Sequence, residues 1–333
     1  MHRFVYRAPI WAVLLLLLAA CAGASPPAGA PATASDEASA TTLTAVKVEA
    51  VTVDGTDATW EKAPVLSVST VGATEDAADG PDVHVQAMYD DQTLALRFEW
   101  ADATESVMKA AWTWDGTAFT KSGDEDRVQL IFPIANDPEF SGKGCAAICH
   151  NMDADPDTWY MSSNDEALSY DVIHWKSART NPYLQADDQV IRVRADPEAE
   201  SGRVGDAKEG GGYADNINEA ADGPSSMHAT DPAAQFIMRG EEVPLDTGAL
   251  AAGAVIPGFV LSPFTGSRGD QTAQGTWLDG TWVVVVKRSL DTGHDDDVVF
   301  TPPKAYPFGL SITDNGGGTA HTIVPDILTL TWQ

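Results

Sequence analysis

Residues 275–286 read Gly-Thr-Trp-Leu-Asp-Gly-Thr-Trp-Val-Val-Val-Val, with aromatic and β-branched residues on either side of Asp279-Gly280. An Asp-Gly pair tolerates the positive φ angles that the type I′ turn of a tight β-hairpin requires. Aromatic and β-branched residues are also the types most enriched in strands. This stretch therefore predicts a β-hairpin, and similar stretches elsewhere determine the fold class.

Short apolar runs of the same kind recur along the chain between Gly, Asp and Pro. Residues 83–88 and 94–100 flank a polar turn and predict a second hairpin. Further strands are expected at residues 127–134, 189–194, 298–300, 308–313 and 327–332. No long amphipathic helix pattern competes with them. The sequence thus predicts an all-β chain that folds as an antiparallel β-sandwich in one domain.

Two long segments do not fit the strand pattern. Residues 136–181 contain a cysteine motif, and residues 196–252 are rich in Gly, Ala, Asp and Glu. Long ordered loops on a rigid scaffold are where binding sites are commonly built. We therefore expect both segments to be loop insertions in the sandwich, and the first to carry a binding site.

The cysteine motif is Cys145-Ala146-Ala147-Ile148-Cys149-His150. Two cysteines followed at once by a histidine can tether a haem through thioethers and ligate its iron. Three residues separate the cysteines here instead of two, but positions i and i+4 of a helical turn share one face, as do i and i+3. The motif predicts one covalent haem c attached to Cys145 and Cys149, with His150 as the proximal iron ligand.

These polar residues allow other interpretations. Cys145 and Cys149 could form a local disulfide with His150 as a bystander, although a disulfide does not need that histidine. A zinc site is weaker, because no second Cys/His pair at ligand spacing exists in the chain. The aspartates of residues 153–157 lack the Gly and Glu of a helix-loop-helix calcium site, and residues 291–297 are expected to form a polar turn.

The N-terminal residues predict a compartment. Arg3 and Arg7 precede an apolar run at residues 10–20, which is too short to span a bilayer and resembles a secretory signal. This run ends in Leu-Ala-Ala-Cys, similar to a bacterial lipobox, so Cys21 is expected to be lipidated and to anchor the chain to a bacterial membrane, facing the periplasm or the cell exterior. The predicted boundaries are a lipoprotein signal peptide over residues 1–20, a flexible tether over 21–43 and the haem-binding sandwich over 44–333.

The formal charge of the chain is −29 at pH 7. Nucleic acids and anionic lipid surfaces both need a basic face, so neither is an expected partner, and the membrane is reached through the lipid anchor only. The acidic residues are spread along the chain, which is typical of a solvated surface and, secondarily, of a docking face for a basic redox protein.

Seven short segments carry a family resemblance. They are residues 85–90 (Val-Gln-Ala-Met-Tyr-Asp), 96–102 (Leu-Arg-Phe-Glu-Trp-Ala-Asp), 144–150 (Gly-Cys-Ala-Ala-Ile-Cys-His), 174–182 (His-Trp-Lys-Ser-Ala-Arg-Thr-Asn-Pro), 266–270 (Gly-Ser-Arg-Gly-Asp), 279–282 (Asp-Gly-Thr-Trp) and 288–293 (Arg-Ser-Leu-Asp-Thr-Gly). Together they resemble the ethylbenzene-dehydrogenase-type haem-binding domain, which is related to DOMON-like cytochrome domains. The resemblance implies a β-sandwich that binds one haem and transfers electrons in the periplasm, often for a molybdenum oxidoreductase.

The resemblance also implies axial ligands. Members with a non-covalent haem use a Met on an early strand and a Lys or His near the C-terminus, which correspond here to Met88 and His321. An iron has two axial positions, so the first expectation is His150 with His321, and the second is Met88 in place of His321. His174, beside Trp175, is expected to be packed or hydrogen-bonded.

An electron carrier performs no bond-making reaction, so the chain is not expected to be an enzyme by itself. The alternative function is a non-redox lipoprotein module whose sandwich binds a carbohydrate-type ligand, a role that loop aromatics such as Trp159 and Tyr160 would suit. No nucleophile motif supports a hydrolase.

Overall fold

The computed structural model describes residues 41–155, 158–317 and 320–333. Cys21 and the predicted signal peptide lie outside the described residues, as does most of the predicted tether. The tether's last two residues, Thr42 and Leu43, belong to strand β1, and Leu43 is fully buried. No helix in the described part of the chain is long and apolar enough to cross a membrane.

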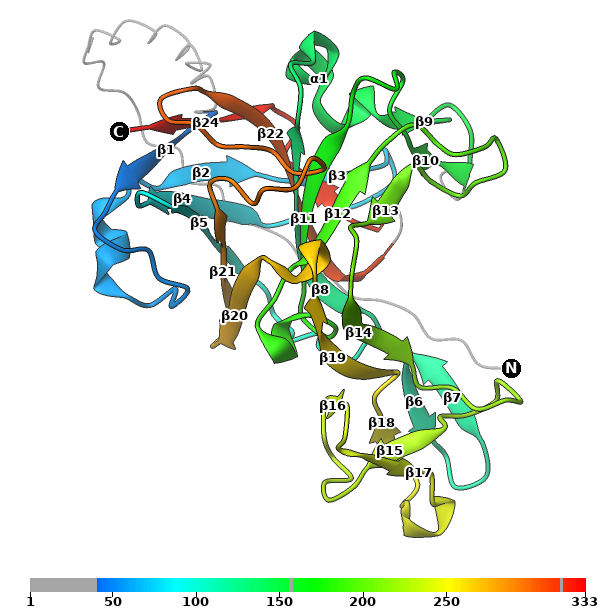
Figure 1. Cartoon of the computed structure of the whole chain (residues 1–333). Helices are drawn as coiled ribbons and strands as arrows, with labels where there is room; N and C mark the ends of the chain where they lie inside the picture. The colour runs from blue at the N-terminus through cyan, green and yellow to red at the C-terminus, as the bar shows by residue number, and fades with distance from the viewer. Residues whose placement is uncertain (1–40, 156–157, 318–319) are drawn as a thin grey trace, which may run out of the picture. The chain divides into compact units, whose positions relative to one another are not determined.

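One large curled sheet forms the body of the fold (Figure 1). From edge to edge its strands are β13 (Arg203–Gly205), β12 (Asp187–Ile191), β11 (Tyr170–Lys176), β8 (Glu125–Pro133), β22 (Tyr306–Gly316), β24 (Leu328–Trp332), β1 (Thr42–Lys47), β4 (Asp82–Tyr89), β5 (Thr93–Ala101), β21 (Thr281–Ser289) and β20 (Thr272–Leu278). The strands of this path pair in antiparallel fashion except at β1, which runs parallel to both β24 and β4.

The core lies between the two halves of the curled sheet. Trp175 on β11 contacts Trp100 on β5 and Trp282 on β21, with ring centroids 6.4 and 5.1 Å apart, so strands from opposite halves meet in the interior. Alternate residues of each strand point inward, as period-two geometry requires. The all-β sandwich predicted from the sequence is confirmed.

Both predicted hairpins are present. Strands β4 and β5 pair along their length, as do β20 and β21. Asp279 and Gly280 have φ angles of +51° and +81°, the pair of positive values that a type I′ turn requires. The strands expected at residues 127–134, 189–194, 308–313 and 327–332 correspond to β8, β12, β22 and β24.

The strand expected at residues 298–300 is wrong. The backbone of this segment is hydrogen-bonded outside any sheet: the Val298 N–H donates to the carboxylate of Asp171 at 3.0 Å, and the Phe300 N–H donates to the Leu290 carbonyl at 2.8 Å. The apolar composition of the segment predicted a strand, but Val298 and Phe300 pack into the central core without joining a sheet.

The first insertion is only partly a loop. It contains α1 (Pro138–Lys143), η2 (Gly144–Ala147) and the short hairpin of β9 (Cys149–His150) and β10 (Tyr160–Met161). It then returns to the main sheet as β11, a fully buried strand that the sequence did not predict because Asp171, His174 and Lys176 interrupt its apolar pattern.

Smaller sheets and turns complete the fold. In Figure 1 strands β6, β7 and β14 to β19 lie below the main sheet. The remaining elements are η1 (Ala58–Lys62), β2 (Leu66–Ser69), β3 (Val71–Gly72), β6 (Ala111–Trp114), β7 (Phe119–Ser122), η4 (Asn181–Tyr183), β14 (Gly210–Asp215), β15 (Ser226–His228), β16 (Ile237–Met238), β17 (Glu242–Pro244), η5 (Thr247–Ala249), β18 (Val255–Ile256), β19 (Phe259–Thr265), η6 (Ser267–Gly269) and β23 (Thr322–Ile323).

Candidate functional site

A cavity of about 460 Å³ lies on the outward face of β8, β11 and β22. On β8, Val128 and Leu130 point into the central core, while Arg127, Gln129 and Ile131 alternate with them and line the cavity. Its volume falls within the range of about 300–1,000 Å³ typical of small-molecule and cofactor sites. The floor of the cavity is therefore a rigid sheet.

The first insertion supplies another part of the lining. Cys145 on η2 and Cys149 on β9 both reach the cavity, as do Tyr160 and Met161 on β10. Cys145 approaches the sheet closely at Gly309: a Cβ atom added there would lie 2.8 Å from the Cys145 Sγ. The absence of a side chain at position 309 therefore allows the cysteine to lie against β22.

The two thiols differ in local structure but share one environment. The sequence predicted a helical turn through both cysteines, whereas only Cys145 lies in a helical turn and Cys149 begins a strand. Both are free cysteines, so the structure contains no disulfide between them. Burial raises the pKa of the Cys145 thiol to about 12 and also raises that of Cys149, which keeps both thiols protonated at neutral pH.

The structure does not bring His150 into the lining of the cavity. Its chain neighbour Cys149 and its cross-strand partner Tyr160 both line the cavity, so His150 lies beside the lining without being part of it. The His150 Nε2 lies 2.9 Å from the carbonyl oxygen of Ser162, and its ring stacks on Tyr160 with centroids 5.2 Å apart. His150 is thus in contact with a residue of the lining, and its expected place opposite His321 across a haem stays a prediction.

His321 and His174 both line the cavity. His174 projects from the middle of β11, where its Nδ1 lies 3.2 Å from the Oε1 of Gln189. Burial, together with the cations Lys176 and Arg203, holds the pKa of His174 well below its usual range. The ring is therefore neutral at pH 7, the form that can bind a metal. The expected hydrogen bond is present, but the sequence did not indicate that His174 also faces a cavity.

Met88 is remote from this lining. It is fully buried on β4 in a separate cluster with Trp60, Ala95 and Val285. Its neighbour Ala87 points into the central core, so Met88 projects from the opposite face of the sheet. The structure does not bring together Met88 and the cysteine motif, which the resemblance had suggested.

Two arginines give the cavity a basic side. Arg127 pairs with Asp124 at 2.6 Å and with Glu125 at 3.2 Å, and Arg203 donates to the Gln129 Oε1 at 3.1 Å. Sequence reasoning missed both, because only the register of β8, β12 and β13 shows that they meet. Arg127 is thus already paired with two carboxylates, whereas Arg203 donates to a neutral amide. A guanidinium recognises carboxylates well, so Arg203 is the group that suits an anionic ligand.

Other residues of the His-Trp-Lys segment support the floor of the cavity. Trp175 packs in the core, and Lys176 forms a buried ion pair with Asp187 on the neighbouring strand β12. Arg268 also pairs with Asp187 at 2.6 Å, and Tyr213 donates to it at 2.9 Å. Burial would raise the pKa of Asp187, but Lys176 and Arg268 outweigh it and lower the pKa to about 2. These contacts fix β11 against β12.

The residues of the cavity fit a covalently attached haem. Two thiols and two imidazoles converge on it, apolar side chains such as Ile131 and Ile323 offer a surface for a macrocycle, and Arg127 and Arg203 suit its propionates.

Comparisons with solved structures return β-rich carbohydrate-binding proteins at low similarity. A putative carbohydrate-binding protein from Bacteroides uniformis has 10% sequence identity and a TM-score of 0.38, covering 88% of this chain and 99% of that chain. A family 9 carbohydrate-binding module from Caldicellulosiruptor kristjanssonii, in complex with cellotriose, has 10% identity and a TM-score of 0.35, covering 88% and 93%. No curated protein matches the chain.

A protein-family comparison covers most of the sequence. The model described as ethylbenzene dehydrogenase matches residues 57–322, a range that includes the cysteine motif, His321 and every residue of the cavity lining except Ile323. The chain therefore belongs to the ethylbenzene dehydrogenase family.

Proposed function

We propose that the chain is a c-type cytochrome that holds one haem in this cavity and carries electrons to or from an oxidoreductase. The observation that carries the proposal is the convergence of Cys145, Cys149 and His321, from distant parts of the chain, on one cavity. Membership of the ethylbenzene dehydrogenase family supports a role associated with an oxidoreductase.

The side chains around the cavity have distinct roles in this proposal. When haem is bound, Cys145 and Cys149 would hold it through two thioethers to its vinyl groups, and Arg127 and Arg203 would face its propionates. Haem iron supplies reversible one-electron chemistry when it is bound. The sheet floor, with Gly309 under Cys145, keeps one side of the site rigid.

His150 and His321 are the proposed axial ligands. His321 already lines the cavity, whereas His150 must exchange its hydrogen bond with the Ser162 carbonyl for the iron. His174 is the competing ligand, because it lines the same cavity as a neutral imidazole.

The remaining parts of the proposal concern location and partner. Acylation of Cys21 would anchor the protein to a bacterial membrane with the sandwich facing the periplasm or the cell exterior. The proposed partner is a redox protein, such as a molybdenum oxidoreductase, with a basic docking surface. The charge of −29 on the chain favours such a surface electrostatically.

A visible absorption spectrum tests the proposal. The protein, produced in a bacterium that attaches haem to exported cytochromes, should be red, and its pyridine haemochrome spectrum should be that of a haem with two thioether bonds. A colourless protein that binds oligosaccharides would overturn the proposal and support the carbohydrate-binding alternative, for which Trp159 and Tyr160 in the lining would be the contacts.

A further inference from the structure

A second group of polar residues lies inside the sandwich, away from the cavity. Asp171 on β11, Asp188 on β12 and Asp297 in the segment after β21 are each at least 98% buried. One carboxylate oxygen from each lies within 4.8 Å of the other two. Asp297 also forms such a trio with Asp206 and Asp296. These residues converge from four separate segments of the chain.

Many oxygens of this group have no hydrogen-bond partner among the described residues. They are Asp171 Oδ1, Asp188 Oδ1, both carboxylate oxygens of Asp206 and of Asp297, and Oε1 of Gln271. Gln271 is fully buried and donates its amide N–H to Asp188, which places a neutral amide beside the carboxylates. Leaving a buried polar group unsatisfied costs about 1–3 kcal/mol, and more if the group is charged. The concentration of unsatisfied oxygens in one place therefore indicates that a ligand binds among them.

The charge of the region is also unbalanced. Arg288 pairs with Asp171 and lies 4.0 Å from Asp297, and Arg192 pairs with Asp296 at 3.1 Å. Two guanidinium groups thus face six carboxylates, namely Asp171, Asp188, Asp206, Asp270, Asp296 and Asp297. His294 lies 3.8 Å from Asp270 at the more exposed side of the group. A buried excess of negative charge must be neutralised by bound protons or by a cation.

We propose that a calcium ion binds between Asp171, Asp188 and Asp297, with Gln271 and Asp206 as further oxygen donors. Ca²⁺ takes six to eight oxygen ligands in flexible geometry, and Asp171, Asp188, Asp206, Gln271 and Asp297 offer oxygens and no thiol or imidazole. Zn²⁺ prefers nitrogen and sulfur ligands, and Mg²⁺ keeps several waters. The donor set therefore favours calcium.

The ion would connect the two halves of the sandwich. Asp171 and Asp188 belong to β11 and β12, whereas Asp297 follows β21 on the opposite half. Alternation along β11 points Asp171 inward and His174 outward into the cavity. Calcium would thus hold the strand that forms the floor of the haem cavity, and this role does not depend on whether haem binds there.

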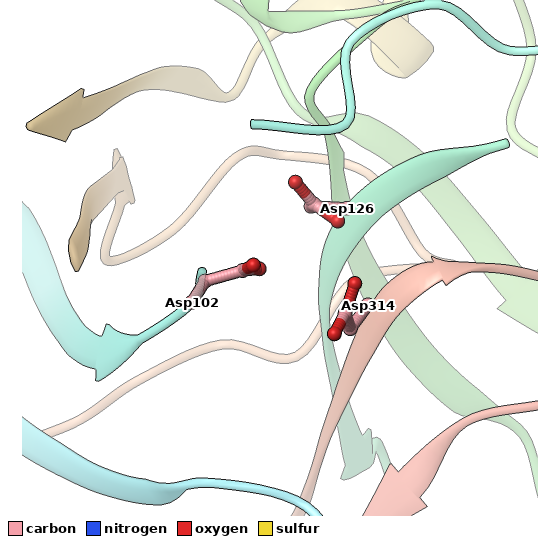
Figure 2. A group of neighbouring side chains, drawn as sticks. All are labelled: Asp102, Asp126 and Asp314. Atoms are coloured by element: carbon pink, nitrogen blue, oxygen red, sulfur yellow. The ribbon is translucent and has the colours of Figure 1, made fainter. Parts of the chain in front are cut away.

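A second acidic group serves as a control. Figure 2 shows Asp102, Asp126 and Asp314 from three segments pointing toward one another. The Asp126 carboxylate already accepts hydrogen bonds from the Ser106 N–H at 2.8 Å and the Trp282 indole N–H at 3.0 Å. Asp314 is exposed, so this group has less need of a cation.

The test uses the full-length protein and calcium chloride. After treatment with EGTA and dialysis, Tm is measured by calorimetry while calcium chloride is added, and the metal content of the untreated protein is measured by mass spectrometry. We expect about one calcium per chain and a rise in Tm of about 5 °C at a hundredfold excess over Kd. Magnesium chloride should give a much smaller rise.

Variants assign the binding to these residues. The double variant Asp188→Asn with Asp297→Asn should lose the calcium-dependent rise, and Asp314→Asn should keep it. An unchanged Tm of the wild-type protein after EGTA and after calcium, together with no bound calcium, would overturn the proposal even if the double variant fails to fold. A calcium response that the double variant retains in full would equally overturn it.

Discussion

At the scale of single residues, Gly309 and Gln189 position two side chains of the cavity lining. Gly309 leaves the space in which Cys145 lies against β22, and Gln189 holds the Nδ1 of His174. The ring of His174 is kept neutral by burial, and the two thiols are kept protonated for the same reason. The charged side chains of the lining include Arg127 and Arg203, which are half-buried and would suit propionates.

Replacing the cavity histidines tests the axial ligands. His321→Ala should convert a low-spin haem spectrum into a high-spin one, because it removes a ligand, whereas His174→Ala should leave the spin state unchanged. The measurement is visible absorption and electron paramagnetic resonance of the purified variants. A high-spin His174→Ala protein beside a low-spin His321→Ala protein would transfer the role to His174.

Met88→Ala provides the control for this series. Met88 packs in a separate buried cluster, so its truncation should lower the free energy of unfolding by about 2–5 kcal/mol without changing the haem spectrum. A spectral change comparable to that of His321→Ala would show that Met88 reaches the iron after all.

Asp126 gives a pH dependence with a definite sign. Burial raises its pKa to about 6 from 3.8, although backbone N–H groups of Asn315 and Ser106 act in the opposite direction. The folded state then binds a proton more tightly than the unfolded state does, so this contribution to stability is complete below about pH 4 and is lost as the pH rises through 6. Two pKa units correspond to about 3 kcal/mol.

Urea unfolding of the wild type and of Asp126→Asn checks this expectation. The stability of the wild type relative to the variant should fall by about 3 kcal/mol between pH 4 and pH 7. A difference that is constant over this range would show that Asp126 keeps an ordinary pKa.

At the scale of elements, local signals explain which parts of the fold could be predicted. The β20–β21 hairpin follows from the turn chemistry of Asp279-Gly280 and a run of valines, both of which are contiguous in sequence. Strand β11 could not be predicted this way, because its buried Asp171 and Lys176 are stable only through Arg288 and Asp187 on other strands.

The same distinction applies to the candidate site. Cys145, Cys149 and His150 form a contiguous motif, and His321 came from a family resemblance. His174, Arg127 and Arg203 join the cavity only through strand register, which a single sequence does not specify. Cys149 and His150 also lie in a two-residue strand and not in the helical turn that the sequence suggested.

The β20–β21 turn can be tested with a matched pair of glycine variants. Gly280 has φ of +81°, and an added Cβ would lie 3.7 Å from the Asp102 carbonyl oxygen, an ordinary contact, so Gly280→Ala should cost about 1–2 kcal/mol from backbone strain alone. Gly142 in α1 has no positive φ and nothing within 4 Å of an added Cβ, so Gly142→Ala should be neutral or stabilising. Equal unfolding free energies of the two variants, measured with urea, would contradict the turn assignment.

At the scale of the whole molecule, two outward faces of the curled sheet differ in what covers them. The outward face of β8, β11 and β22 carries the cavity, whereas the outward face of β4 and β5 is covered by the cluster around Met88 and Trp60. A ligand in the cavity would therefore lie against the first insertion.

The proposed anchor is testable at this scale. The wild-type protein should partition into the detergent phase of a Triton X-114 extraction, because an acylated Cys21 carries the only expected membrane attachment. Cys21→Ala should remain in the aqueous phase or keep its signal peptide. Equal partitioning of the two proteins would remove the lipoprotein assignment.

The most direct test of the covalent haem is the intact mass of the denatured protein after export from a bacterium that matures c-type cytochromes. The account predicts the mass of the chain plus one haem, and the variant with Cys145→Ala and Cys149→Ala should show the mass of the chain alone. A wild-type mass without haem, whether the protein is coloured or not, would contradict covalent attachment at Cys145 and Cys149.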